Sequence, residues 1–140
     1  MSSDNIANLE KIGQLVREPA AQQEFDTLVE SGRKRLKDAK NPDNELESRF
    51  DLAYNAAHAL ALAGLRARGY RAKSRYIVFQ VLPQTLGIAD AEWRVLAAAH
   101  DRRNKYEYEG ELNIDEALLA EMLAVAEKLL RAVAALGPVG

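Results

Sequence analysis

The sequence contains no cysteine among its 140 residues and only two histidines, His58 and His100. Without cysteine there is no disulfide, no thiolate nucleophile and no cysteine-ligated zinc site, and such a composition suits a reducing compartment. The two histidines are also too far apart for the i, i+4 spacing that places two metal ligands on one helix face. We therefore expect no metal site and no cofactor, and we expect a cytoplasmic protein.

Long apolar segments and phosphate-binding loops are missing as well. The longest apolar-rich stretch, residues 56–65, is interrupted by His58 and is far shorter than the roughly 20 residues that cross a bilayer. The N-terminus lacks the basic start and apolar run of a secretion signal. Neither a glycine-rich phosphate loop nor a nucleophile elbow is present. The sequence thus predicts no membrane partner and favours acid–base chemistry or binding.

Charge is nearly balanced, since the formal net charge is -2 and the isoelectric point about 5.7. Any site for a polyanion must therefore come from local clustering. Residues 66–75 contain such a cluster without an acid. Its cations are Arg66, Arg68, Arg71, Lys73 and Arg75. Tyr70 and Tyr76 are interleaved with them, as in a groove that follows a phosphate backbone and stacks bases. A solvated helix end has the same composition, so both interpretations stay open.

Apolar side chains recur at helical spacing along most of the chain. Breaks are expected at Pro19, at residues 41–44, at Gly69 and at Gly87. The predicted helices cover residues 4–17, 20–39, 45–68, 76–82, 90–110 and 114–136. We therefore expect an all-α fold, a single domain over residues 1–140 that forms an up-and-down bundle of five or six helices.

Two of these helices have distinctive patterns. Residues 45–68 are rich in alanine and apolar on more than one face, which predicts the central helix. The last helix carries apolar residues at alternating spacings of three and four: Leu119, Met122, Ala126, Leu129, Val133 and Leu136. This seam packs lengthwise on another helix, either in the same chain or in a second copy. We expect Asn113 to cap the last helix, and a strand is the alternative for residues 76–82.

The densest polar stretch, HDRRNKYEYEG, covers residues 100–110. On a helix, His100, Asn104 and Tyr108 fall at i, i+4 and i+8, and Arg103 lies beside them. Arg103 could hold a phosphate, while Asn104 could brace the backbone or a ligand. Tyr108 could donate to a phosphate oxygen, and His100 could move a proton near neutral pH. This stripe is the candidate catalytic or binding site.

Arg102 and Lys105 add two cations to the same stretch and are candidates for nucleic-acid binding. An ordinary helix surface is the alternative interpretation. In that case Arg103 pairs with Glu107, and Asp101 pairs with Lys105, each at i+4. The spacing alone does not decide between a ligand site and a set of surface ion pairs.

Two further polar residues have simpler interpretations. His58 follows Tyr54 by four residues among alanines and leucines, which predicts a buried, hydrogen-bonded core histidine in preference to a catalytic base. Arg94 precedes His100 by six residues, which places the two about 120° apart around a helix. We therefore expect Arg94 to have a surface role.

The alanine-rich helix with FDLAYNAA at residues 50–57, the glycine-ended basic turn and the later Arg-Asn pair resemble the HEPN superfamily. The resemblance covers roughly residues 45–135, with residues 1–40 as N-terminal helices packed on that region. It implies a small α-helical bundle, often dimeric, and often encoded in toxin–antitoxin systems beside nucleotidyltransferases. Many members are metal-independent ribonucleases whose Arg-Asn-x-x-x-His motifs meet at a dimer interface.

Mapped on this chain, the family's arginine and asparagine fall on Arg103 and Asn104, and the histidine position falls on Tyr108. A tyrosine with an ordinary pKa of about 10 is a poor general base at neutral pH. His100 is a substitute proton carrier without support from the motif. The resemblance therefore implies a homodimer that binds RNA, a nucleotide or a partner such as a nucleotidyltransferase-like protein, without strong catalysis. Metal-independent RNA cleavage and a purely structural homodimer are the alternatives.

Overall fold

The structure is a computed structural model that describes residues 2–109 and 115–139, with side chains described over 5–105 and 115–139. These residues form seven helices and two short strands. In chain order they are α1 (Ser2–Lys11), β1 (Leu15–Arg17), α2 (Gln22–Ala39), α3 (Leu46–Ala67), β2 (Tyr70–Ala72), α4 (Arg75–Gln80), α5 (Leu82–Leu86), α6 (Asp90–Glu109) and α7 (Glu116–Ala134).

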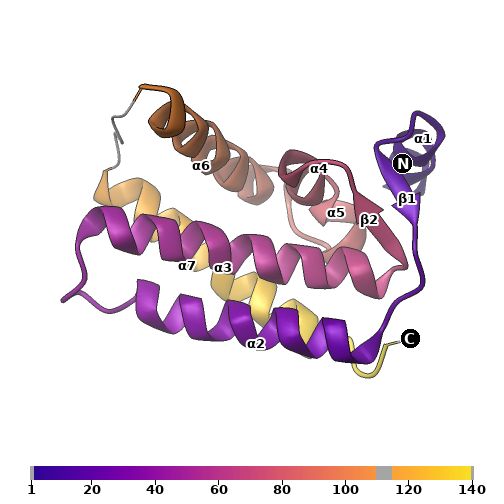
Figure 1. Ribbon diagram of the computed structural model, residues 1–140, viewed down its shortest axis with the longest axis horizontal. Coiled ribbons are helices and arrows are strands. Elements are labelled where there is room, and N and C mark those ends of the chain that lie inside the picture. Colours follow the sequence, from indigo (N-terminus) through magenta and orange to yellow (C-terminus); the bar gives the residue numbers. More distant parts are fainter. Residues whose placement is uncertain (1, 110–114, 140) are drawn as a thin grey trace.

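The four long helices α2, α3, α6 and α7 alternate in direction (Figure 1). The helix α2 lies along α3, and α7 packs against both, whereas α6 contacts α3, α4 and α7. The predicted all-α bundle is thus confirmed in outline, although the described residues add a two-stranded sheet and more helices than the five or six expected. Within the described ranges, no helix has the length and apolarity that a membrane crossing requires.

The helix α3 is central, as predicted, because it contacts α2, α4, α5, α6, α7 and β2. Its alanines are buried on several faces, and Ala53, Ala57 and Ala61 have no exposed surface. Small residues allow neighbouring helices to approach closely. At Gly32 of α2, an added Cβ would lie 2.5 Å from Leu60 Cγ of α3. The spacing of α2 and α3 therefore depends on a residue without a side chain.

The apolar seam of α7 is buried inside the same chain, against α2, α3 and α6. Leu119 is 3% exposed, and Met122 and Leu129 are fully buried, whereas Leu136 lies beyond the helix end and is 42% exposed. The helix is capped by Asp115, whose Oδ1 accepts from Leu118 N at 2.7 Å. The cap predicted at Asn113 is therefore wrong, and Asn113 itself lies outside the described residues.

The first predicted helix, residues 4–17, is wrong in its second half. It ends at Lys11 because Gly13 adopts a left-handed conformation with φ of 79°. The chain then forms β1, which pairs with β2 in the basic segment that was predicted to be a plain connection. The antiparallel register is Leu15↔Ala72, Val16↔Arg71 and Arg17↔Tyr70. Each strand is short, and its partner is remote in sequence, so local periodicity contains no trace of the pair.

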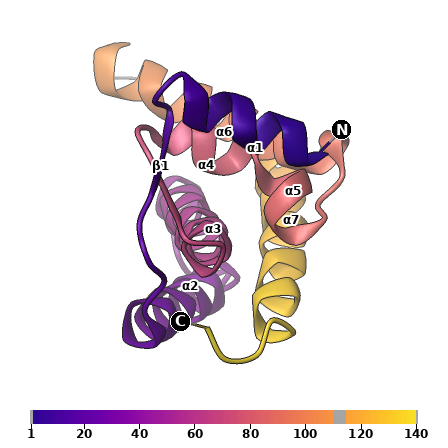
Figure 2. The same ribbon diagram turned by 90° about the vertical axis from the view of Figure 1, so that its right-hand side faces the viewer.

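Two short helices follow the sheet, so the helix predicted for residues 76–82 is confirmed in outline and the alternative strand is wrong. Ser74 Oγ caps α4 by accepting from Ile77 N at 3.4 Å. The helix α5 has Pro83 in its first turn and ends at Leu86, and Gly87 after it is left-handed with φ of 69°. Figure 2 shows α1 lying across one end of the molecule next to α5. The helix α4, which packs against α6, places Arg75 over Tyr54 of α3.

Candidate functional site

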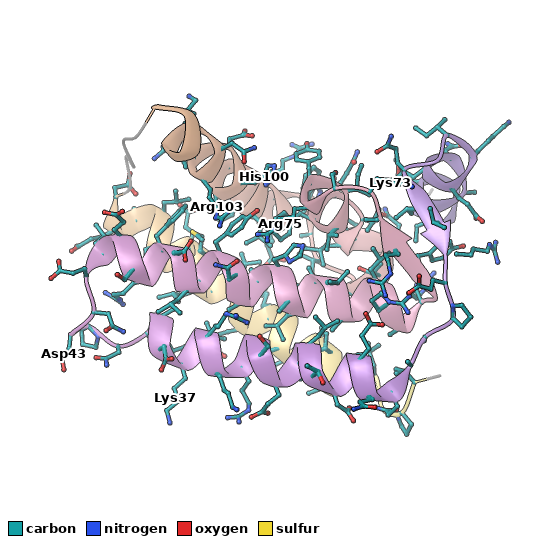
Figure 3. The ribbon with its side chains drawn as sticks, in the orientation of Figure 1. Lys37, Asp43, Lys73, Arg75, His100 and Arg103 are labelled. Atoms are coloured by element: carbon teal, nitrogen blue, oxygen red, sulfur yellow. The ribbon has the colours of Figure 1, made fainter. Side chains whose placement is uncertain are left out.

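The candidate site surrounds the ring of Tyr54, where α3, α4 and α6 meet. Figure 3 shows Arg75 of α4 and His100 and Arg103 of α6 in the space between α6 and α3. We use the name Tyr54 cluster for six residues from these helices: Tyr54, His58, Arg75, His100, Arg103 and Asn104. Contacts among five of them join a phenol, an imidazole, two guanidinium groups and an amide. His58 is included because the charges of Arg75, His100 and Arg103 act on its imidazole.

Tyr54 is fully buried, and three contacts hold its ring in place. Its hydroxyl lies 2.9 Å from His100 Nδ1. The ring meets Phe79 edge-on, with centroids 5.9 Å apart, and stacks on His100 at 6.2 Å. A buried tyrosine normally needs a hydrogen-bond partner for its hydroxyl, and here that partner comes from α6. Tyr54 therefore couples the central helix to the predicted polar stripe.

Two guanidinium groups from different helices lie over this one ring. Arg103 Cζ is 5.1 Å from the Tyr54 centroid, and Arg75 Cζ is 5.7 Å away. Both distances fall in the range of cation–π contacts. Arg75 also donates to Asn55 Oδ1 at 3.5 Å, and Arg103 Nε lies 3.5 Å from Asp51 Oδ1. The Asp51 side chain is 59% exposed, so water screens this ion pair.

His100 connects the cluster through both of its ring nitrogens. Asn104 Nδ2 lies 3.1 Å from His100 Nε2, and the Tyr54 hydroxyl is at Nδ1. An amide NH₂ group only donates, so in this arrangement Nε2 accepts and Nδ1–H donates to Tyr54. Turning the Asn104 amide would instead let its oxygen accept from Nε2–H, with Nδ1 accepting from the Tyr54 hydroxyl. The predicted common face of His100 and Asn104 is confirmed, and their role stays a prediction.

His58 differs from its prediction, because it is half-buried and makes no hydrogen bond within the described residues. Its ring meets Phe79 edge-on at 5.9 Å. Burial is the main reason that the pKa of His58 is lowered from 6.5 to about 4. The charges of Arg75, His100 and Arg103 also lower this pKa. The imidazole thus experiences a positive potential, which would favour an anion at the same place.

The basic stretch 66–75 is divided by the fold, and Arg66 belongs to the interior. Its side chain is 2% exposed. Its Nε donates to Glu24 at 2.9 Å, and its other nitrogens donate to the carbonyl oxygens of Glu18, Pro19 and Tyr70 at 2.9, 2.7 and 3.2 Å. The prediction that Arg66 contacts nucleic acid is therefore wrong, because its donors are used inside the protein.

Arg71 belongs to the same ionic network. Its Nε donates to Glu18 Oε2 at 2.8 Å, and its Nη2 donates to Glu24 Oε2 at 2.8 Å. Hydrogen bonds from Arg71, supported by Arg66, hold the pKa of the Glu24 carboxyl below its ordinary value. Both acids also raise the pKa of Arg71. Arg71 thus ties β2 to α2, which leaves little of its hydrogen-bonding capacity for a ligand.

The other cations of this stretch are separated from one another. Arg68 is exposed and donates to the Gln84 carbonyl oxygen at 2.9 Å. Lys73 is exposed and lies near β1 in Figure 3, away from the Tyr54 cluster. Of the five cations in residues 66–75, Arg75 is the one that the described contacts place at the Tyr54 cluster. The five cations do not form one continuous surface.

The remaining predicted residues belong to α6. Lys105 is exposed, and no ion pair joins it to Asp101 in the described part of the chain. Arg102 is half-buried. The side chains of Glu107 and Tyr108 lie outside the described residues, so the predicted pair of Arg103 with Glu107 and the role of Tyr108 stay predictions. Among described side chains, no group of three His, Asp or Glu residues is arranged to hold a metal ion.

A group of aromatic rings adjoins the cluster near the start of α6. Trp93 is half-buried, and its Nε1 donates to Asp90 Oδ1 at 3.1 Å. Tyr76 meets Trp93 edge-on at 6.1 Å and lies 6.1 Å from His100. Arg94 is exposed, with its guanidinium 6.0 Å from the Trp93 ring, which confirms the predicted surface position.

Sequence reasoning missed the central position of Tyr54. The usable signal was the pair Tyr54 and His58, which places a phenol and an imidazole at i, i+4 on an otherwise alanine-rich helix. Such a pair marks one polar face on a helix that is buried elsewhere. Nothing local, however, indicates that Arg75 and Arg103 meet on that face.

Comparison with known protein families gives no matching family model, and a search of curated proteins gives no significant match. The functional interpretation therefore depends on the residues and their arrangement.

Proposed function

We propose that this chain is a HEPN-like helical module that binds the phosphate groups of RNA or of a nucleotide at the Tyr54 cluster, without strong catalysis. The main support is the placement of Arg75 and Arg103, which come from α4 and α6 and lie over the same buried ring. The arginine and asparagine that resemble the family motif, Arg103 and Asn104, are both members of this cluster.

Arginine suits this role because its planar guanidinium can bind a phosphate with two parallel hydrogen bonds and stays charged at any physiological pH. The chain as a whole carries a net charge of -2 and does not attract a polyanion. Attraction must therefore come from a local field. The cations that disfavour protonation of His58 supply such a field.

Binding is favoured over cleavage because both nitrogens of His100 are already engaged, with Tyr54 and with Asn104. A general acid or base needs a free lone pair or proton within reach of the reacting group. The tyrosine at position 108 is also a poor base at neutral pH. Metal-independent RNA cleavage is the second candidate, because His100 lies one helical turn from Arg103 and can exchange Asn104 for a substrate.

The resemblance further leads us to propose a cytoplasmic homodimer, with a nucleotidyltransferase-like partner, in a bacterial toxin–antitoxin or related system. The seam of α7 is buried within the chain from Leu119 to Val133, and its last residue, Leu136, is exposed, so the seam offers little surface for such a dimer. A purely structural dimer through that seam is correspondingly the weakest alternative.

The test is binding of a fluorescently labelled single-stranded RNA, followed by anisotropy in the presence of EDTA. We expect Arg75→Ala and Arg103→Ala each to weaken binding about 10-fold or more, since a hydrogen bond to a charged group contributes about 1.5 kcal/mol. The salt slope, which is the slope of the logarithm of the binding constant against the logarithm of the salt concentration, should also become shallower by about 0.7 for each phosphate that the variant no longer neutralises. The control is Lys37→Ala, which also removes one positive charge. Lys37 is an exposed residue of α2 and lies away from the cluster (Figure 3).

The same RNA, separated on a denaturing gel, distinguishes binding from cleavage. Intact RNA supports the binding proposal. Cleavage that persists in EDTA and disappears in Arg103→Ala and His100→Ala would establish the ribonuclease alternative. If neither RNA nor a nucleotide changes the anisotropy or the melting temperature, the proposal is wrong. Melting curves of each variant show that a loss of binding is not a loss of fold.

A further inference from the structure

We propose that Tyr76 is a base-stacking residue of this site, so that the Tyr54 cluster takes a nucleotide whose base is unpaired and unstacked. This inference depends on the proposed function, because it adds a base subsite to the phosphate subsite. It predicts a preference for single-stranded RNA, or for a free nucleotide, over a duplex of the same charge.

The first observation is the exposure of the Tyr76 ring. Tyr76 is 38% exposed, and the other large exposed apolar residues among those described, Ile12, Val16 and Leu136, are aliphatic. A base stacks on an aromatic face, because every base has a π-surface, whatever its hydrogen-bonding pattern. Tyr76 is therefore the described residue best suited to this contact.

The second observation is that two neighbouring rings hold Tyr76 in position. Trp93 meets it edge-on at 6.1 Å with an interplanar angle of 82°, and His100 lies 6.1 Å away at 56°. Both neighbours belong to α6, whereas Tyr76 belongs to α4. A side chain that is already ordered loses little conformational entropy when a ligand binds. The ring is thus prepared for stacking before the ligand arrives.

The third observation is the position of this ring next to the cations. Arg75 precedes Tyr76 in the chain, and Arg75 and Arg103 both lie over Tyr54. His100 contacts the rings of both tyrosines. A nucleotide carries its phosphate and its base on one sugar, so a ligand with both groups can reach the cations and the ring together.

Tyr70, the other tyrosine of the basic stretch, is already occupied. It is half-buried, with the Arg17 guanidinium 5.5 Å from its ring centroid and its hydroxyl 3.5 Å from Glu10 Oε1. In the sequence, Tyr70 and Tyr76 have the same surroundings, since both lie among the cations of the basic stretch. In the structure, Tyr70 is half-buried in β2, whereas the Tyr76 ring is exposed to solvent.

The experiment compares two labelled oligonucleotides of equal length and charge, one with all its bases and one in which every sugar lacks its base. Tyr76→Leu removes the ring but keeps the apolar bulk, and Tyr76→Phe keeps the ring. We expect Tyr76→Leu to weaken binding of the complete oligonucleotide about 5- to 100-fold with an unchanged salt slope. Binding of the abasic oligonucleotide should stay unchanged, and Tyr76→Phe should bind like the original protein.

Arg75→Ala and Arg103→Ala separate this inference from the proposed function. They should weaken both oligonucleotides and reduce the salt slope. If they do so while Tyr76→Leu binds the complete oligonucleotide normally, or weakens both oligonucleotides equally, the stacking inference is wrong and phosphate binding stands. If the original protein binds neither oligonucleotide, both proposals are wrong. Melting curves verify that the Tyr76 variants are folded.

Discussion

Arg66 and Arg75 lie nine positions apart in one basic run, and their surroundings give them opposite roles. The Arg66 guanidinium is buried, with its donors directed at an acid and at main-chain carbonyl groups. Arg75 is exposed and lies over Tyr54. The two residues have the same chemistry, so burial and neighbouring acceptors decide which one can meet a ligand. The role of a single cation in this protein is set by its environment.

At the same scale, His58 should make the protein sensitive to acid. The unfolded chain binds a proton at this residue near pH 6.5, whereas the folded chain does so only near pH 4. Below pH 6.5 the unfolded state therefore binds more protons, and stability falls as the pH falls. We expect the free energy of unfolding to be lower by about 2 kcal/mol at pH 5 than at pH 7.5 because of this residue. Urea unfolding of His58→Gln at the same two pH values should show a difference that is smaller by this amount.

An NMR titration of the His58 ring provides a direct measurement of the same effect. A midpoint near pH 6.5 would contradict the prediction, as would an equal pH dependence in His58→Gln and in the original protein. Anion binding should raise the midpoint, because a bound phosphate offsets the positive charges of Arg75 and Arg103.

At the scale of elements, Arg66 joins the sheet to the bundle. It belongs to α3, and it binds Glu18 and Pro19 after β1, Glu24 in α2 and Tyr70 in β2. We expect Arg66→Met to lower the free energy of unfolding by about 2–4 kcal/mol, because several buried acceptors lose their donors. Urea denaturation measures this change.

The control for this prediction is Arg68→Met, two residues further along the chain. Arg68 is exposed and donates to one carbonyl oxygen, so its loss should cost less than about 1 kcal/mol. Equal effects of the two variants would show that burial of the Arg66 guanidinium contributes nothing particular to stability.

A second prediction at this scale concerns the approach of α2 to α3. Alanine is a better helix former than glycine by about 1 kcal/mol, yet Gly32→Ala should destabilise the protein. The new Cβ would lie 2.5 Å from Leu60 Cγ and 3.3 Å from the Ala56 carbonyl oxygen. Overpacking of this kind costs about 1–3 kcal/mol. Because this cost exceeds the gain in helix propensity, we expect a lower free energy of unfolding, measured in urea.

The double variant Gly32→Ala, Leu60→Ala tests the proposed cause. In the Leu60→Ala background the clash with the Leu60 side chain is absent and the 3.3 Å approach to the Ala56 carbonyl oxygen remains, so adding Gly32→Ala should lower the free energy of unfolding by less than it does in the original protein. A Gly32→Ala variant that is more stable than the original protein would contradict the close packing of these two helices.

At the scale of the whole molecule, α7 completes the helical bundle by packing its apolar seam on α2, α3 and α6 of the same chain. Leu129 is fully buried, whereas Leu136 is 42% exposed at the far end of the same seam. Leu129→Ala should therefore cost about 2–5 kcal/mol through the cavity that it leaves. Leu136→Ala should cost less than about 0.5 kcal/mol. Denaturant unfolding of the two variants gives both values.

Light scattering of the same two variants addresses the oligomeric state. We expect neither substitution to change the molar mass in solution, because the seam is satisfied within one chain. A dimer that dissociates in Leu136→Ala would place this part of the seam at an interface between copies.

Most of the helical fold could be predicted from the sequence, because amphipathic spacing is a local property. The bounds of α2 and α3 agree with the prediction within a few residues, and the central position of α3 follows from its alanines. The pairing of β1 with β2 could not be predicted, because each strand is stabilised by a partner far away in the chain. Local periodicity cannot report such a contact.

The candidate site was predictable only where its residues share one helix. His100 and Asn104 follow from i, i+4 spacing, and their side chains are in contact. Arg75 and Tyr54 join them from two other helices. Their distances along the chain carry no information about that meeting, so the assembly of the site could not be read from the sequence.

The sequence by itself thus determined the helical content, the central alanine-rich helix and the polar stripe of α6, since each depends on spacing within one turn or two. The tertiary structure decided which cations are buried in ion pairs and which reach Tyr54. It also decided that the seam of α7 is internal and that the Tyr76 ring is exposed. The physical reason is that burial, charge pairing and electric field depend on groups brought together from distant parts of the chain.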